Sequence, residues 1–141
     1  MEVFLLKVLI CDDDKCIVDE IKNNLNTFSD KHRIVFDIDL FYNGVELLNS
    51  NISYDMAFID IEMPQVNGLT LSAQLKKVNS NIIIFIITSH DAYLDDAMDL
   101  DVFRYLSKPI DNNRFFRALN TAINYYHSNT QIITLEYYDE Y

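Results

Sequence analysis

Apolar segments of the chain alternate with segments whose apolar residues recur at helical spacing. The first kind predicts strands, which are expected at residues 3–11, 34–41, 55–60, 82–88 and 102–106. The second kind predicts a helix of about 15 residues behind an N-cap at Asp14. A short helix that carries Val45, Leu47 and Leu48 is expected after the turn at Asn43-Gly44, and further helices are expected at 67–78, 91–100 and 114–126. This alternation predicts an α/β fold, a doubly wound five-stranded parallel sheet with helices on both faces.

The predicted strands are expected to occupy different places in the sheet. Residues 82–88 are the most hydrophobic and are predicted to be central. Residues 34–41 alternate apolar side chains with acidic ones, which predicts a strand with one solvent-exposed face at the edge of the sheet. Residues 29–33 are polar and predict a turn. A last segment, residues 131–138, also reads as extended.

Composition and charge narrow the class of protein. The 141 residues, half of them apolar, suit one domain with a buried core. Acidic residues outnumber basic ones by 22 to 11, which argues against this segment binding nucleic acid, because backbone binding needs clustered cations. The start lacks the basic region of a signal peptide, and the longest apolar run, residues 82–87, is too short to cross a bilayer. We expect a cytoplasmic protein without a membrane partner.

Cys11 and Cys16 are the only cysteines, and their spacing fits no zinc or redox motif. They do not predict a disulfide framework. We expect both thiols to be reduced and to be buried or half-buried.

The candidate functional residues stand where the predicted strands end. In a parallel sheet of this kind, ligands bind beyond the carboxyl ends of the strands, so these side chains are expected to converge. Pro64 and Gly68 turn the chain away after the third strand. The converging residues are Asp12, Asp13, Asp60, Thr88 and Lys108.

These residue types together predict phosphoryl transfer. Three carboxylates in one crevice repel each other and require neutralisation. Oxygen ligands without His or Cys favour Mg²⁺, or alternatively Mn²⁺, over zinc. Lys108 offers a compact positive charge and Thr88 a hydroxyl, which leaves Asp60 as the nucleophile. Each motif alone has a structural explanation, since an Asp after a strand is usually a cap. Four such motifs, each at the carboxyl end of its own predicted strand, instead favour a phosphoryl-transfer site.

Two segments carry a family resemblance. Leu9-Ile10-Cys11-Asp12-Asp13-Asp14 resembles the acidic pair of the receiver domains of two-component response regulators, and Asp60-Ile61-Glu62-Met63-Pro64 resembles their phosphorylation-site signature. The resemblance covers residues 3–128 and implies a flavodoxin-like, three-layer α/β/α fold with strand order 2-1-3-4-5. The remaining matching residues are Gly68, Thr88, Tyr105, Lys108 and Pro109.

The resemblance also implies roles for the site residues. Asp60 would accept a phosphoryl group from a sensor histidine kinase. Asp13 and Asp60, with the backbone carbonyl of Glu62, would hold Mg²⁺, and Asp12 would act mainly through water. Lys108 would pair with the phosphoryl group.

A switch is implied by the same family. Thr88 would move toward the phosphoryl group and Tyr105 would turn inward, changing the face made by the fourth helix, fifth strand and fifth helix. The peptide bond before Pro109 would be cis. Two positions that tune hydrolysis of the phosphoryl group in the family are occupied here by Glu62 and His90, and an exposed loop histidine without such a role is the alternative.

Residues 103–111, with Arg114 and Phe115, resemble the subgroup whose output is a LytTR-type DNA-binding domain. The receiver domain would span residues 1–128, and residues 129–141 would be a tail or linker. The extended segment there would open a truncated output domain, complete a stand-alone receiver, or pair between chains. Control of transcription is the expected output. DNA would be bound only through an output domain absent from this chain, and a phosphorylation-dependent homodimer is a further expectation.

Two other functions compete with the phosphorylated switch. A pseudo-receiver would bind partners without phosphorylation, although the full set of acidic residues, Thr88 and Lys108 argues against it. A phosphatase of the haloacid dehalogenase type would carry its nucleophile on the first strand and a second Asp two residues later, whereas position 62 is Glu. At most, the chain would catalyse its own Mg²⁺-dependent phosphorylation and slow dephosphorylation.

Overall fold

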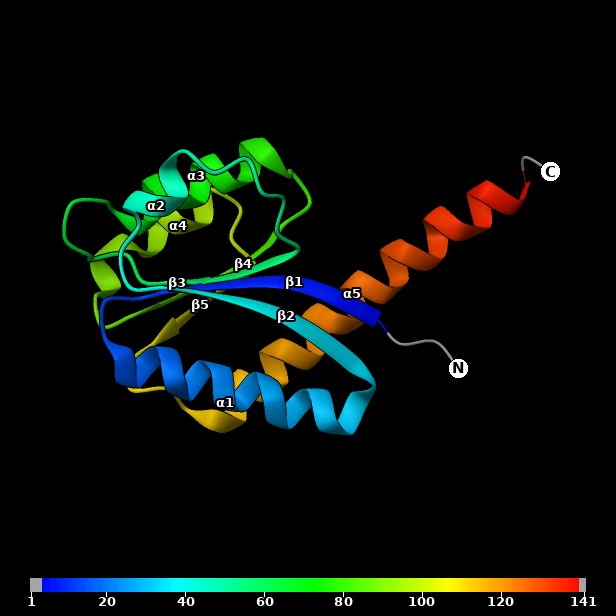
Figure 1. Cartoon of the computed structure of the whole chain (residues 1–141), viewed down its shortest axis with the longest axis horizontal. Helices are drawn as coiled ribbons and strands as arrows, with labels where there is room; N and C mark the ends of the chain where they lie inside the picture. The colour runs from blue at the N-terminus through cyan, green and yellow to red at the C-terminus, as the bar shows by residue number, and fades with distance from the viewer. Residues whose placement is uncertain (1–3, 140–141) are drawn as a thin grey trace. The chain divides into compact units, whose positions relative to one another are not determined.

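The computed structural model describes residues 4–139, and side chains through residue 128. It divides into two compact units, the first ending at Ile110 and the second beginning at Asp111. The first unit holds a parallel sheet in the order β2-β1-β3-β4-β5, as the resemblance implied (Figure 1). Val3, the predicted start of the first strand, lies outside the described residues. The strands are β1 (Phe4–Cys11), β2 (Ile34–Phe41), β3 (Met56–Ile59), β4 (Ile83–Thr88) and β5 (Arg104–Ser107).

Helices of the first unit cover both faces of this sheet. Helix α1 lies on one face, and α2, α3 and α4 lie on the other (Figure 1). The layered arrangement confirms the predicted flavodoxin-like α/β class. A 3-10 turn, η1 (Asp91–Tyr93), precedes α4 and takes up part of the helix predicted at 91–100. The helices are α1 (Lys15–His32), α2 (Val45–Leu48), α3 (Gly68–Val78) and α4 (Leu94–Asp99).

Strand burial follows the predicted pattern. Every residue of β3 and β4 is buried, because both strands have neighbours on either side and helices on both faces. The rings of Phe58 and Phe85 stack with centroids 4.7 Å apart across these two strands. Strand β2 lies at the edge and is mostly half-exposed, as its acidic alternation predicted. Strand β5 begins two residues later than predicted, at Arg104.

Two helix starts agree with their sequence signals, and one helix end does not. The side chain of Asp14 accepts a hydrogen bond from the backbone N–H of Cys16, which confirms the predicted N-cap of α1. Asn67 caps α3 in the same way through Leu69. The predicted turn at residues 29–33 is wrong, since α1 continues to His32 and only Arg33 leaves the helix, with a left-handed φ of 54°. Basic residues in the last turn suit the helix dipole.

The second unit is the helix α5 (Asn112–Asp139). The extended segment predicted at 131–138 is therefore wrong. Its β-branched residues favour a strand locally, but no Gly or Pro interrupts residues 112–139, and extending an existing helix costs far less than starting a new element. Tyr141, part of the predicted tail, lies outside the described residues. None of the helices between residues 4 and 139 combines the length and hydropathy needed to cross a bilayer.

Candidate functional site

The sheet brings the three predicted carboxylates together. Asp12 follows β1 and Asp60 follows β3, and the backbone N–H of Asp60 donates to the carbonyl of Cys11 at 3.0 Å. The pairing of the two strands thus continues to the site itself. Asp12 and Asp60 are buried, with exposed fractions of 2% and 6%, while Asp13 is exposed. One carboxylate oxygen from each of the three lies within 4.8 Å of those of the others.

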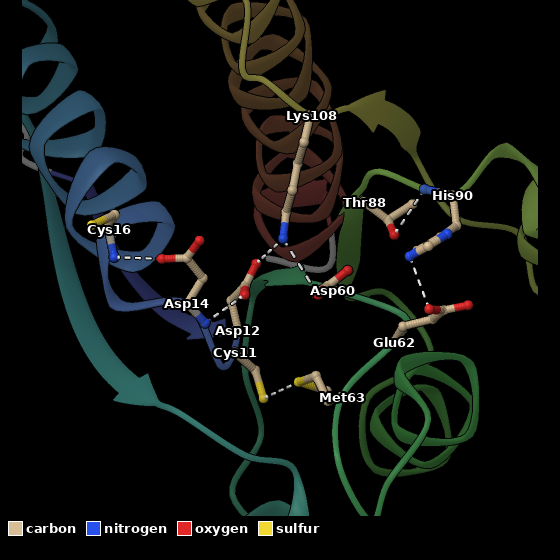
Figure 2. A network of polar contacts seen from close by, with 10 residues as sticks. All are labelled: Cys11, Asp12, Asp14, Cys16, Asp60, Glu62, Met63, Thr88, His90 and Lys108. Atoms are coloured by element: carbon tan, nitrogen blue, oxygen red, sulfur yellow. Dashed lines mark hydrogen bonds and ion pairs between the residues drawn. The ribbon is translucent and has the colours of Figure 1, made fainter.

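Lys108 enters the same crevice from the end of β5. Its backbone N–H donates to the carbonyl of Thr88 at 2.9 Å, which fixes where the side chain begins. The ammonium Nζ lies 2.8 Å from Asp12 Oδ2 and 3.3 Å from Asp60 Oδ2 (Figure 2). The contact with Asp12 is the shorter one, and sequence reasoning did not predict it. The bond from Lys108 to Pro109 is cis, as predicted.

Burial and charge shift the pKa values of this pair. Burial alone would lower the pKa of Lys108, but the hydrogen bond and charge of Asp12, followed by Asp60, raise it above its ordinary value. Burial raises the pKa of Asp12, and the hydrogen bond from Lys108 opposes that rise. The lysine is therefore held as a cation between two buried carboxylates.

The donor set fits a hard cation. Asp60 Oδ1 is buried and has no hydrogen-bond partner among the described residues. A carboxylate oxygen of the exposed Asp13 lies within 4.8 Å of oxygens of Asp12 and Asp60, so the three possible metal ligands are all oxygens. A cation here would satisfy the unpaired oxygen and reduce repulsion among the carboxylates. The cluster can thus hold a metal ion, as the sequence predicted.

Gly68 allows the loop after β3 to close tightly on the site. A Cβ at this position would lie 2.1 Å from the backbone oxygen of Asp60. The backbone N–H of Gly68 donates to the carbonyl of Ile61 at 2.8 Å. Between them, Gln65 takes a left-handed φ of 72° after Pro64. This is the constrained turn that the Pro-Gly spacing predicted, and it fixes the backbone beside Asp60.

Thr88 and Tyr105, the predicted switch residues, both bond to the backbone of His90. Thr88 is fully buried at the end of β4, and its hydroxyl accepts from the N–H of His90 at 3.4 Å. The hydroxyl of Tyr105 donates to the carbonyl of His90. The structure therefore brings both residues to the site's border, where His90 links them.

A contact across the same border was missed by sequence reasoning. The two carboxylate oxygens of Glu62 contact different side chains. His90 Nε2 lies 2.8 Å from Oε2, and the hydroxyl of Tyr93 donates to Oε1 at 3.2 Å. The sequence pointed to Glu62 and His90 but did not predict that Tyr93 contacts Glu62, because Tyr93 stands in a 3-10 turn that only the structure defines.

The two cysteines have different environments. Both are free thiols, as predicted. Cys11 is buried beneath the site, where its Sγ lies 3.6 Å from Met63 Sδ, and burial followed by the charge of Asp12 raises its pKa to about 12. Cys16 is exposed in the first turn of α1, so the expectation that it is buried or half-buried is wrong. Its position on the outer face of an amphipathic helix explains the difference.

Comparison with known proteins agrees with this geometry. Residues 8–120 match the family described as the response regulator receiver domain. The chain belongs to this family. Its predicted membership is thereby confirmed, together with the fold that the family implies. The chain is thus a response regulator receiver domain.

Two curated relatives are similar over most of this receiver domain. The sensory transduction protein LytT of Bacillus anthracis is 31% identical over 115 residues, covering 82% of this chain and 46% of LytT. The transcriptional regulatory protein BtsR of Escherichia coli K12 is 31% identical over 117 residues, covering 82% of this chain and 47% of BtsR. The chain thus spans about half the length of these relatives. The relative named LytT agrees with the predicted subgroup.

A solved structure agrees with the fold of the receiver domain. The response regulator TrrA of Thermotoga maritima, in complex with Mg²⁺ and BeF, has a TM-score of 0.69 at 24% identity. The match covers 83% of this chain and 98% of that one. The likeness therefore extends over nearly the whole length of that solved chain.

Proposed function

We propose that Asp60 of this receiver domain accepts a phosphoryl group from a sensor histidine kinase. The observation that carries the proposal is the buried Asp60 carboxylate, paired through Oδ2 with Lys108 and left with Oδ1 unpartnered among the described residues. A carboxylate oxygen of Asp60 bonds to phosphorus as the phosphorus–nitrogen bond of the kinase phosphohistidine breaks, and the electron pair of that bond returns to the imidazole. Lys108 neutralises charge on the transferred group.

The metal in this proposal is Mg²⁺, with Mn²⁺ as the alternative. Asp13, Asp60 and the backbone carbonyl of Glu62 would hold it, and Asp12 would act through water. The ion would supply positive charge opposite the phosphoryl oxygens. An all-oxygen donor set and the TrrA complex with Mg²⁺ support this choice. Asp12 meanwhile holds Lys108 at 2.8 Å, which keeps the ammonium aimed at the crevice.

The switch in this proposal uses Thr88 and Tyr105. Once Asp60 is phosphorylated, the hydroxyl of Thr88 turns to a phosphoryl oxygen and Tyr105 moves inward. Both residues would give up their present bonds to the backbone of His90. The face of the first unit that carries α4 and β5 would then bind a partner or a second phosphorylated copy of this chain.

The output in this proposal is transcription. The relative BtsR is named a transcriptional regulatory protein, and the chain spans about half its length. DNA would be bound by a LytTR-type domain outside this chain, because the chain itself carries a formal charge of −11. The receiver would comprise residues 1–128, with 129–141 as the linker to that domain. The proposed location is the cytoplasm, where a kinase and Mg²⁺ are both available.

Intact-mass analysis after incubation with acetyl phosphate tests this function. We expect one added phosphoryl group that requires Mg²⁺ and is absent from Asp60→Asn. Asp19→Asn, an exposed position on α1, is the matched control and should be labelled like the wild type. If the wild type gains no phosphoryl group but still binds Mg²⁺, the chain is a pseudo-receiver that recognises partners without phosphorylation. A group that remains on Asp60→Asn would mean that another residue is the acceptor.

A further inference from the structure

Strand β2 forms one edge of the sheet, and none of the other described strands lies beyond it (Figure 1). The carbonyls of Arg33 and Phe41, at its two ends, accept from backbone N–H groups on the β1 side at 3.4 and 3.1 Å. Since the backbone groups of successive strand residues point to opposite edges, those of the even-numbered residues from Ile34 to Leu40 point away from β1. The carbonyl of Ile34 also accepts from the Ser29 hydroxyl, which uses one of its two lone pairs. This edge can therefore pair with a further strand.

One face of this edge carries exposed apolar side chains. Phe36 lies against Phe28 of α1 with ring centroids 6.4 Å apart, so the neighbouring Val35 points to the opposite face of the sheet. Val35 is 47% exposed, and Leu5, its register partner on β1, is 64% exposed. The two side chains form an apolar strip at an open sheet edge, where another chain can pack.

Charged residues flank Val35 along the strand. Arg33 stands two residues before it and Asp37 two residues after it, and both are exposed. Lys7 of the same chain lies 3.3 Å from Asp37, but the Asp37 side chain remains 54% exposed and can be approached by a second cation. A cation, an apolar centre and an anion in this order are complementary to the same order read backwards.

Antiparallel pairing of two β2 strands brings these two orders together when Val35 of one copy faces Val35 of the other. In that register Ile34 of each copy faces Phe36 of the other. Both are even-numbered residues whose backbone groups point to the open edge, so each such pair exchanges two N–H···O=C bonds. The register that aligns the two apolar centres is therefore also one that the backbone of β2 allows.

The charges select this register over its neighbours. With the Val35 residues opposed, Arg33 of each copy faces Asp37 of the other, which gives two ion pairs across the strands. A shift that opposes the two Asp37 residues, or Asp37 with Asp39, places like charges opposite each other and is destabilising. One register thus satisfies the hydrogen bonds, the apolar centre and the charges together.

We propose that two copies of this chain form a dimer by antiparallel pairing of their β2 strands, with Val35 at the two-fold axis. The dimer needs no phosphorylation, because none of its contacts involves Asp60. It is also separate from the face that carries α4 and β5, since β2 and β5 lie at opposite edges of the sheet. The paired strip is small, so the dimer is weak and becomes populated at roughly 100 µM protein.

Sedimentation equilibrium of two charge reversals and their mixture tests the dimer. Arg33→Asp alone and Asp37→Arg alone each place like charges opposite at two points, so we expect the dissociation constant to rise at least about tenfold. In an equal mixture the two substitutions face each other and restore both ion pairs, so the mixed dimer should associate about as tightly as the wild type. Lys77→Asp, a charge reversal at an exposed position of α3, is the matched control and should dimerise like the wild type. Circular dichroism checks that each variant is folded.

A cross-link at the two-fold axis gives a second readout. Facing residues in a non-hydrogen-bonded antiparallel pair have Cα atoms about 4.5 Å apart, within the range of a disulfide. In a Cys16→Ser background, Val35→Cys should therefore form an intermolecular disulfide under mild oxidation. Val45→Cys, at a similarly exposed apolar position, should not.

The outcomes separate this dimer from other associations. A wild type that stays monomeric up to about 1 mM, or a mixture that associates no more tightly than its two components, would overturn the inference. Dimerisation that appears only after treatment with acetyl phosphate would overturn it as well. Asp60→Asn should dimerise like the wild type, so this inference and the proposed role of Asp60 can fail independently.

Discussion

The crevice around Asp60 has a floor and a rim, and each contains a carboxylate with a cationic or ionisable partner 2.8 Å away. The floor is the buried set Cys11, Asp12, Asp60 and Thr88, into which Lys108 projects. The rim is the set Asp13, Glu62, His90 and Tyr93. In the floor, the side chains of Lys108 and Asp12 are 17% and 2% exposed, whereas in the rim those of His90 and Glu62 are 46% and 45% exposed.

Two contacts of equal length therefore need not contribute equally to stability. Removing one partner of a buried ion pair leaves a charge without water or counter-ion, which is costly. Removing one partner of an exposed pair leaves a carboxylate that water solvates at once. We therefore expect a substitution in the floor to have a larger effect, on stability and on the proposed phosphorylation of Asp60, than one in the rim. Four variants or measurements test this division, beginning with the largest effect.

Lys108→Met should give the largest loss. The variant removes the cation that neutralises Asp12, Asp60 and the incoming phosphoryl group, so we expect the rate of labelling by acetyl phosphate to fall about 100- to 1,000-fold. Time-resolved intact-mass analysis measures this rate. Lys15→Met is the matched control, because Lys15 is exposed at the start of α1 and lies over the ring of Tyr42. An equal loss in both variants would contradict the division.

Alkylation of the two cysteines compares the floor with the exposed first turn of α1. Only the thiolate reacts with iodoacetamide, and the pKa of Cys11 is raised to about 12, first by burial and then by Asp12. At pH 8 we expect Cys16 to react at least about 100 times faster than Cys11 in the folded protein. Mass spectrometry of peptides gives both rates, and raising the pH toward 12 should speed the reaction of Cys11. Equal rates in urea would serve as the control, while equal rates without urea would mean that the floor opens readily.

Gly68→Ala tests how closely the backbone of the floor is packed. Alanine would favour the first turn of α3, but its Cβ would lie 2.1 Å from the backbone oxygen of Asp60. We expect the free energy of unfolding in urea to fall by about 2–3 kcal/mol. Gly44→Ala, whose Cβ would come 3.0 Å from a side-chain atom of Val66, should cost less, because a side chain can move more easily than a backbone. A smaller loss of unfolding free energy for Gly68→Ala than for Gly44→Ala would show that the loop after β3 moves to make room for the added Cβ.

The sequence predicted the floor better than the rim for a physical reason. Strand patterns and the ends of parallel strands place Asp12, Asp60 and Lys108, since hydrophobic burial and the topology of an α/β sheet leave little choice. The conformation of a surface segment depends on contacts that no periodic pattern encodes. Tyr93, which donates to Glu62, stands in a 3-10 turn that starts at Asp91, where the sequence predicted the start of a helix.

The prediction of an extended segment at residues 131–138 was wrong for a different reason. Residues 131–138 have the β-branched and aromatic content of a strand, yet they continue α5. Intrinsic β-propensity is a weak preference, and no breaker separates this segment from the helix before it. The turn predicted at residues 29–33 failed similarly, since polar residues in the last turn of α1 are compatible with a helix that ends at His32.

His90→Ala should give the smallest effect on stability. The contact between His90 and Glu62 is half-exposed at both side chains, so its loss should change the free energy of unfolding by no more than about 0.5 kcal/mol. Lys108→Met, measured in the same urea titration without divalent cations, should lose about 3 kcal/mol, because two buried carboxylates then face each other without a counter-charge. Both partner contacts are 2.8 Å long, so the ratio of the two losses reflects burial together with the second contact of Lys108, to Asp60. Similar losses would mean that the contacts among Glu62, His90 and Tyr93 support the fold itself and that the rim is no less structural than the floor.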